Sequence, residues 1–323
     1  MQLDPADQAA FERIAARVSG EIARLGPALR ELAGERLARL LEGEFSQIVA
    51  LLPRWLSDLA PLDEERCDQL GCAGLYAWWY GQIIDDILDG AERPEALPAA
   101  QLALLRAIDA YRELGLLAGE PWGDLLARTD ASAEAYAHEL APRPVDPAGV
   151  TDEQLACWTP ELIIERASPA GFVVTAQLAL AAPPNAAALQ ADLDGALRCL
   201  MGARQIADDA SDWLADLKAG QLNYVSAGLI RHFRRHTAPA ERGELTLERL
   251  AGYELGAEPY WEEVVRTYEE LCDAAQARLA AYGPCRLRAL IERQRTHDRA
   301  VFRRMRERRE ALRLAFTGVV GGA

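Results

Sequence analysis

Apolar residues recur at intervals of three and four along most of the chain, the spacing of one face of an α-helix. Residues 1–60 contain two or three such patterns, one of them at Phe11, Ile14 and Val18, punctuated by Pro53 and Pro61. The pattern predicts further helices over residues 63–90, 99–118, 121–140, 152–182, 188–217, 224–236, 258–282 and 285–316. No strand pattern or internal repeat emerges. The sequence therefore predicts an all-α helical bundle in a single domain over residues 1–323.

Local signals mark several predicted helix ends. Asp63 is placed to cap the helix over residues 63–90, and Thr151 with Gln154 has the spacing of a capping box. Pro169 and Gly171 interrupt the apolar pattern of residues 152–182, which predicts a kink there.

The predicted helix over residues 63–90 is almost wholly apolar from Leu70 to Leu88. A helix that is apolar on all sides is typical of a central position in the core. Its aromatic residues, Trp78, Trp79 and Tyr80 among them, therefore either pack in the core or line a cavity. Tyr80 and Gly81 lie about one turn before Asp85, beneath any site that the aspartates form.

Aspartates at helical spacing stand out in two places. Asp85, Asp86 and Asp89 form one Asp-Asp-x-x-Asp sequence, and Asp208, Asp209 and Asp212 form another, which Asp216 extends by one turn. Residues four apart on a helix differ by only about 40° of rotation, so Asp85 and Asp89 lie on one face of their helix. Asp208, Asp212 and Asp216 likewise lie on one face of theirs. Stacked carboxylates repel one another, and a hard divalent cation such as Mg²⁺ would offset that repulsion.

A solvated acidic surface is the alternative interpretation of each motif taken alone. Two copies, each among apolar residues such as Ile83, Ile87 and Ile206, favour buried carboxylates, which need partners or metal.

Three cations are candidates to bind an anion near these motifs. Arg166 lies in an apolar segment just before Pro169, where it either pairs with Glu165 or an aspartate or contacts an anion at the helix break. Arg204 lies one turn before Asp208, and a salt bridge to Asp208 is its alternative role. Lys218 is the only lysine in the chain and ends the second motif helix, where the helix dipole alone also favours a cation.

Composition narrows the functional classes. The formal net charge of −15 argues against nucleic-acid binding, which needs clustered Lys and Arg. The six cysteines are scattered without a zinc-ligand spacing, so we expect reduced thiols. No signal segment and no run of about 18 apolar residues is present, and we therefore expect a cytoplasmic protein without a membrane span. No Ser/His/Asp or Cys/His arrangement is evident.

The two motifs in this order on an all-helical chain resemble those of the class I (trans) isoprenoid synthases. Asp85-Asp86-Ile87-Leu88-Asp89 resembles the first aspartate-rich motif of that family, and Gln205 to Asp212 resembles the second. Asp208, Asp212 and Asp216 keep the spacing of the metal triad of the terpene cyclases. The segment from Asp216 to Tyr224 is similar to the end of the family's second motif helix, and the resemblance covers roughly residues 70–230.

The resemblance implies a helical bundle with a central active-site cavity, Mg²⁺, most often three ions, and a prenyl diphosphate substrate. It implies that the metal ligands are Asp85, Asp89, Asp208, Asp212 and Asp216, with Asp86 also in the catalytic set. Arg166, Arg204, Gln205 and Lys218 would bind the diphosphate. Trp78, Trp79, Tyr80, Gly81, Phe172 and Trp213 are the candidates to line an apolar cavity that shields a carbocation from water.

Departures from the family pattern favour one reaction over another. Chain-elongating synthases carry a Gly-Gly-Lys-Arg segment near the N-terminus and an Arg-Arg pair after the first motif. Here Gly26 to Arg30 is a poor match to the former, and only Arg93 follows the motif. The Arg-Tyr pair of the cyclases is also missing.

We therefore expect a terpene cyclase acting on a C15 or C20 allylic diphosphate, farnesyl or geranylgeranyl diphosphate, to give a hydrocarbon or alcohol. The alternative is a prenyltransferase that uses isopentenyl diphosphate or another acceptor, and a third is a non-catalytic helical partner subunit. A homodimer is compatible with the resemblance.

Overall fold

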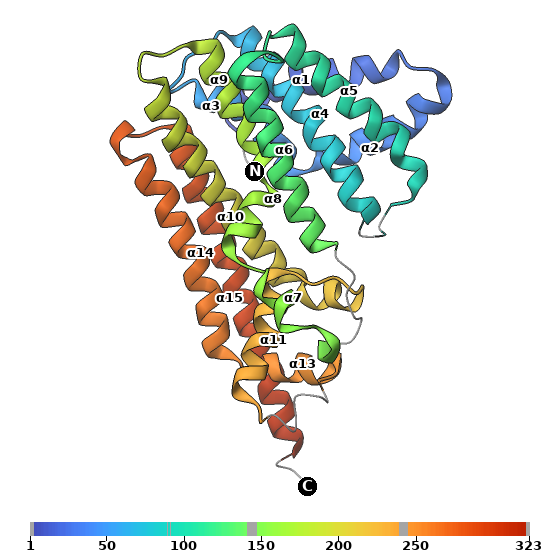
Figure 1. Ribbon diagram of the computed structural model, residues 1–323, viewed down its shortest axis with the longest axis vertical. Helices are drawn as coiled ribbons and strands as arrows, with labels where there is room; N and C mark the ends of the chain where they lie inside the picture. Colours follow the sequence, from blue (N-terminus) through green and yellow to red (C-terminus); the bar gives the residue numbers. More distant parts are fainter. Residues whose placement is uncertain (1–2, 89, 91, 141–146, 239–244, 321–323) are drawn as a thin grey trace. The chain divides into compact units, whose positions relative to one another are not determined.

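The computed structural model describes residues 3–88, 90, 92–140, 147–238 and 245–320, with side chains to residue 315. Every regular element among these residues is a helix, and none is a strand (Figure 1). The all-α prediction is confirmed.

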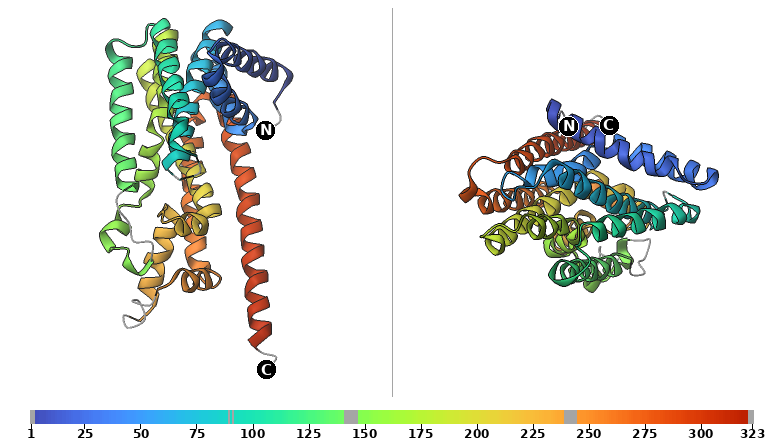
Figure 2. Two further views of the ribbon diagram at one scale, coloured as in Figure 1. Left: turned by 90° about the vertical axis from the view of Figure 1, so that its right-hand side faces the viewer. Right: turned by 90° about the horizontal axis from the view of Figure 1, so that it is seen from above.

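The first half of the chain forms α1 (Pro5–Ala23), α2 (Pro27–Glu42), α3 (Glu44–Leu56), α4 (Glu64–Leu88), α5 (Leu97–Glu113) and α6 (Gly119–Glu139). The second half forms α7 (Asp152–Ala156), α8 (Pro160–Arg166), α9 (Phe172–Ala181), α10 (Ala186–Lys218), α11 (Tyr224–His236), α13 (Leu247–Glu254), α14 (Glu258–Arg278) and α15 (Arg286–Val320). The helix α15 runs without a break over 35 residues (Figure 2).

The predicted caps are present. The Asp63 carboxylate accepts a hydrogen bond of 2.8 Å from the backbone N–H of Arg66 at the start of α4. Thr151 and Gln154 form the reciprocal capping box of α7. These hydrogen bonds satisfy N–H groups that have no partner within the helix.

The predicted helix over residues 152–182 is divided more than expected. It consists of α7, α8, a short 3-10 turn over Ser168–Gly171, and α9. The first break follows from the Thr159-Pro160 pair, because the residue before a proline is pushed out of the helical region and Thr159 is extended there. The helix α13 was not expected from the sequence, although the Thr246 hydroxyl caps it by accepting a hydrogen bond from the backbone N–H of Arg249.

Contacts divide the chain into two compact units. Unit 1 contains residues 1–127, 170–191 and 284–287, and unit 2 contains residues 128–169, 192–283 and 288–323. Both α10 and α15 contribute residues to each unit. The single domain expected from the sequence stays a prediction.

Unit 1 is built around α4, which packs against α1, α3, α5 and α9. This central position is the one predicted for an all-apolar helix. Gly71 permits the close approach of α4 to α3, since a Cβ at this position would lie 2.4 Å from the carbonyl oxygen of Ala50.

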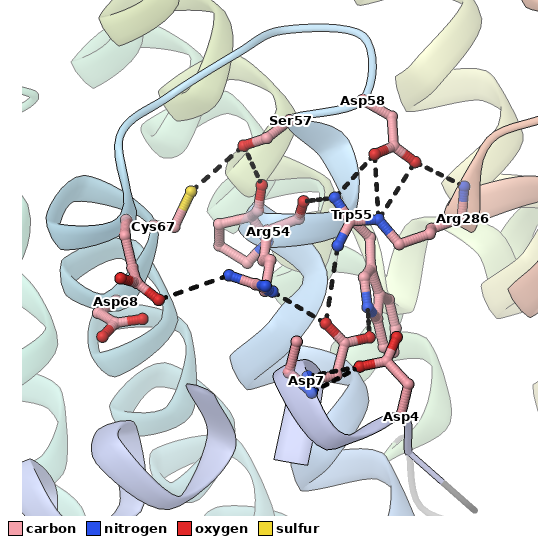
Figure 3. Close-up of polar contacts among 12 residues, drawn as sticks. Asp4, Asp7, Arg54, Trp55, Ser57, Asp58, Cys67, Asp68 and Arg286 are labelled. Atoms are coloured by element: carbon pink, nitrogen blue, oxygen red, sulfur yellow. Dashed lines mark hydrogen bonds and ion pairs between the residues drawn. The ribbon is translucent and has the colours of Figure 1, made fainter. Parts of the chain in front are cut away.

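A polar cluster fastens the ends of three helices in unit 1 (Figure 3). The buried carboxylate of Asp7 on α1 accepts hydrogen bonds from Arg54 Nε at 2.9 Å and Trp55 Nε1 at 2.8 Å on α3. Asp58, just past α3, accepts from both the backbone N–H and the guanidinium of Arg286, the first residue of α15. Asp58 therefore caps α15 from a distant part of the chain.

The core of unit 2 surrounds α10. Buried residues of α10, Ile206, Ala210, Trp213 and Leu217 among them, pack in one cluster with residues of α11, α13, α14 and α15. The inward face of α10 is therefore fixed by this core, and the positions of its aspartates follow from it.

Candidate functional site

The first aspartate motif lies at the C-terminal end of α4 in unit 1. Asp85 is half-buried and Asp86 is exposed, whereas Asp89 lies outside the described residues. Partial burial and the charge of Asp85 raise the pKa of Asp86 above its ordinary value, and the guanidinium of Arg39 acts in the opposite direction. Two adjacent carboxylates at a helix C-terminus lie in a field that favours a bound cation.

Two arginines of α2 lie beside this motif, and the sequence analysis did not identify them. Arg36 and Arg39 approach the carboxylate of Glu92 at 2.9 and 3.5 Å. The backbone N–H of Glu92 donates to the carbonyl oxygen of Asp86 at 2.8 Å. The available signal was an arginine pair three residues apart, which places both side chains on one face of α2.

The aromatic residues predicted to line a cavity in unit 1 occupy different environments. Trp79 and Phe172 are fully buried, and Phe172 contacts the ring of Tyr111 at 4.9 Å between centroids. Trp78 is half-buried and packs edge-on against Phe45 at 4.4 Å. These contacts are those of core residues, and their role as cavity walls stays a prediction.

Gly81 differs from these aromatic neighbours. It is half-buried, as is Tyr80, and a Cβ at Gly81 would meet no atom within 4 Å. There is therefore room for a side chain at Gly81, one helical turn before Asp85.

The second motif lies on α10 in unit 2, and its carboxylates are buried to different degrees. Asp208 and Asp212 are exposed, Asp216 is half-buried, and Asp209 is 4% exposed. The expectation of buried carboxylates is thus wrong for Asp208 and Asp212. At 3.6 residues per turn, Asp208 lies on the side of α10 opposite the core residues Ile206 and Ala210, whereas Asp209 borders that core.

Asp209 joins α10 to the start of α11. Its carboxylate accepts hydrogen bonds from Gln205 Nε2 at 2.7 Å and from the backbone N–H of Tyr224 at 2.9 Å. The side-chain amide of Asn223, which caps α11, donates to Asp216 at 2.7 Å and to the carbonyl oxygen of Asp209 at 3.3 Å. Burial raises the pKa of Asp209 to about 7, although the hydrogen bonds from Gln205 and Tyr224 favour the charged form.

Arg166, Gln205 and Asp209 line one small pocket within unit 2, together with Glu139 and Trp158. Arg166 ends α8, where its Nε lies 3.2 Å from the carboxylate of Glu139. Glu165, the partner expected from the sequence, pairs with Arg198 instead. The pocket has a volume of about 10 Å³, which is room for about one water molecule.

Arginines of α11 hold the residues that flank α7, and Trp158 among them lines this pocket. The guanidinium of Arg231 donates to the carbonyl oxygens of Leu155 and Trp158, the latter at 3.3 Å. Arg234 donates to the carbonyl oxygen of Val150 at 2.5 Å and to Asp152 at 2.8 Å. The arginines of α11 therefore position the polypeptide on either side of α7.

The remaining predicted residues lie along α10. Arg204 is half-buried, Lys218 is exposed at the last helical position, and Trp213 is buried in the unit 2 core. The structure brings Arg166 and Gln205 together and leaves the roles of Arg204 and Lys218 as predictions.

The carboxylates of each motif are of the type that can contribute oxygen ligands to Mg²⁺, the cation that the resemblance implies. Within the described residues, no three His, Cys, Asp or Glu side chains already converge on a point that could hold a metal ion. Mg²⁺ is usually held by one or two carboxylates together with water and substrate phosphates, so it needs no such cage. Asp85 in unit 1 and Asp208 and Asp212 in unit 2 offer oxygen ligands of this kind.

None of the helices in the described part of the chain is long and apolar enough to cross a membrane. No protein-family model matches the sequence, and no curated protein matches it. Among solved structures, the chain is similar to the crystal structure of a putative geranylgeranyl pyrophosphate synthase from Corynebacterium glutamicum, with a TM-score of 0.62 and 16% identity over 89% of this chain and 95% of that one. The chain therefore has the all-helical fold of the class I isoprenoid synthases, as its aspartate motifs predicted.

Proposed function

We propose that this protein is a Mg²⁺-dependent enzyme that ionises an allylic prenyl diphosphate, and that it is a terpene cyclase acting on a C15 or C20 substrate. The observation that carries the proposal is the pair of aspartate motifs, on α4 and α10 of a fold similar to that of the prenyl synthase above. When bound, Mg²⁺ would stabilise the negative charge of the diphosphate as the carbon–oxygen bond breaks.

The residues of the chain have separable tasks in this reaction. Asp85 in unit 1, and Asp208 and Asp212 in unit 2, would each supply exposed or half-buried carboxylate oxygens to Mg²⁺. Arg204 and Lys218 on α10 would take up remaining negative charge of the diphosphate. The apolar surface near Gly81 would hold the prenyl chain away from water.

A diphosphate bound to Arg166 would compete with Glu139 for the charge of the guanidinium, because the Glu139 carboxylate lies against its Nε. Alternatively, Arg166 acts through the pocket that it shares with Gln205 and Asp209, by keeping those side chains in place.

Chain elongation is the second candidate, and one specific observation favours it. Arg36 and Arg39 place positive charge near the first motif, where the sequence alone had shown only Arg93. A second diphosphate could bind there if Glu92 were displaced from these arginines.

The test is to incubate the purified chain with Mg²⁺ and geranyl, farnesyl or geranylgeranyl diphosphate, each with and without isopentenyl diphosphate. A hydrocarbon or alcohol formed without isopentenyl diphosphate, and not formed by Asp208→Asn, supports the cyclase. A longer diphosphate formed only when isopentenyl diphosphate is present identifies a prenyltransferase and overturns our first choice. No product with any combination contradicts both.

A further inference from the structure

The C-terminal end of α11 carries a pair of histidines that the proposed reaction does not use. His232 and His236 are four residues apart, so both side chains lie on one face of the last turn (α11 in Figure 1). Their rings stack with 4.2 Å between centroids and 33° between planes. His236 is exposed and His232 is half-buried, so the edge of the pair is accessible from solvent.

The hydrogen bonds of the pair determine which ring nitrogens are free. Nδ1 of His236 lies 2.9 Å from the carbonyl oxygen of His232, an atom that can only accept, so this nitrogen carries the proton. Nδ1 of His232 lies 2.7 Å from the hydroxyl of Tyr253 on α13. Both rings are therefore held through Nδ1, so Nε2 is the nitrogen of each ring that these two hydrogen bonds leave to a ligand. Ligating histidines in proteins are commonly oriented through their second nitrogen in this way.

The electrostatic surroundings contain groups of both signs. Partial burial, with the neighbouring His236 and Arg235, lowers the pKa of His232, which favours the neutral form that a metal ligand requires. Arg235 opposes a bound cation, whereas Glu263 on α14 and the free carbonyl groups at the end of α11 favour one.

Packing alone is the competing explanation for this arrangement. The ring of His232 also lies near Tyr253 and Tyr260, at 5.8 and 5.7 Å between centroids. Packing accounts for His232, which is half-buried, but it does not account for the exposed His236 stacked upon it in the tautomer that leaves Nε2 free.

We propose that His232 and His236 form a two-histidine site for a late first-row transition-metal ion, such as Cu²⁺ or Zn²⁺, at the C-terminal end of α11. Imidazole nitrogen suits these ions and not Mg²⁺, so the site would be chemically distinct from the aspartate motifs. Water would complete the coordination. The inference does not rest on the proposed function, because no residue of the aspartate motifs belongs to the pair.

The test is calorimetric titration of the untagged full chain with Cu²⁺ and with Zn²⁺, after chelator treatment and in excess Mg²⁺, which occupies the carboxylate sites. The key variant is His236→Ala, because His236 is exposed and its replacement leaves the contacts of His232 with Tyr253 and Tyr260 in place. His297→Ala is the matched control, an exposed histidine on α15. We expect one Cu²⁺ per chain, an affinity that falls roughly 100-fold in His236→Ala because the second nitrogen no longer binds within the same molecule, and no change in His297→Ala.

Equal affinity in the wild-type protein and His236→Ala would overturn the proposal, as would the absence of saturable binding. An affinity that instead falls in Asp85→Asn or Asp208→Asn would place the ion at the aspartate motifs and would also overturn it. The wild-type melting temperature should rise with Zn²⁺, and that rise should be lost in His236→Ala, which gives a readout independent of catalysis.

Discussion

At the scale of single residues, adjacent aspartates on α10 have different roles. Asp208 is exposed to solvent, whereas Asp209 is buried and accepts hydrogen bonds that join α10 to α11. The sequence presents them as an identical pair, and only their angular position relative to the unit 2 core separates them.

Replacement of these two aspartates should therefore affect different properties. We expect Asp208→Asn to abolish turnover with Mg²⁺ and to leave the free energy of unfolding within about 0.5 kcal/mol of wild type, because the side chain is exposed. Asp209→Ala should lower that free energy by about 1–3 kcal/mol, because it leaves buried donors of Gln205 and Tyr224 unsatisfied. Product assays and urea denaturation measure the two effects. Full activity of Asp208→Asn would refute its role as a metal ligand.

Two glycines of α4 offer a second contrast. Gly71→Ala should destabilise the protein, because the added Cβ would lie 2.4 Å from the backbone oxygen of Ala50. Gly81→Phe meets no such obstacle, and we expect it to fold normally but to reduce turnover of a C20 diphosphate more than that of a C10 diphosphate. Gly20→Phe on α1 is the control, since space is also open there. Thermal unfolding and product analysis distinguish the outcomes, and equal loss with both substrates would argue against a cavity beside Gly81.

At the scale of elements, helix ends in unit 1 are secured by side chains from distant parts of the chain. Asp58 follows α3, yet it caps α15 and pairs with the guanidinium of Arg286 at 2.7 Å (Figure 3). Partial burial alone would raise the pKa of Asp58, but the hydrogen bonds and charge of Arg286 hold the pKa below its ordinary value.

Removal of this cap should weaken the protein in a pH-dependent way. Asp58→Ala should lower the free energy of unfolding by about 1–2 kcal/mol near neutral pH, the usual cost of losing a helix cap. A carboxyl whose pKa is lowered by folding stabilises the folded state above its unfolded pKa, so the contribution should disappear as the pH falls below about 4. Asp58→Asn, which keeps an acceptor but no charge, should have a free energy of unfolding between those of the wild-type protein and Asp58→Ala. Urea denaturation at several pH values measures these free energies. A difference between the wild-type protein and Asp58→Ala that persists at the lowest pH would contradict the role of the charge.

At the scale of the whole molecule, each compact unit carries one aspartate motif. Asp85 lies in unit 1, and Asp208, Asp212 and Asp216 lie in unit 2. The net charge of −15 includes both motifs, so a bound cation would reduce repulsion in each unit.

Ligand binding at either motif should therefore stabilise the chain. We expect Mg²⁺ with inorganic diphosphate to raise the melting temperature, and a chelator to reverse the shift, because a ligand that binds only the folded state stabilises it by mass action. Asp85→Asn and Asp208→Asn should each reduce the shift, because each removes a carboxylate from one motif, whereas Glu307→Gln, at an exposed acid of α15, should retain it. The same shift in all variants would mean that the anion binds elsewhere.

The sequence by itself determined the fold class, most helix boundaries and the two motifs. These properties depend on local periodicity, on caps such as Asp63 and Thr151, and on the spacing of aspartates, all of which are written in neighbouring residues. The break before Pro160 was missed because the apolar pattern of residues 152–182 outweighed the local signal of Thr159-Pro160, and α13 was missed because it is only eight residues long.

Only the tertiary structure decided which aspartates are buried, which arginines lie beside the first motif, and what Arg166 contacts. Burial of Asp209 and exposure of Asp208 follow from which face of α10 meets its neighbours. The approach of Arg36 and Arg39 to Glu92, of Arg166 to Glu139 and of Asp58 to Arg286 joins residues 27 to 228 positions apart. Such pairings are set by the packing of whole helices, which no local pattern in the chain encodes.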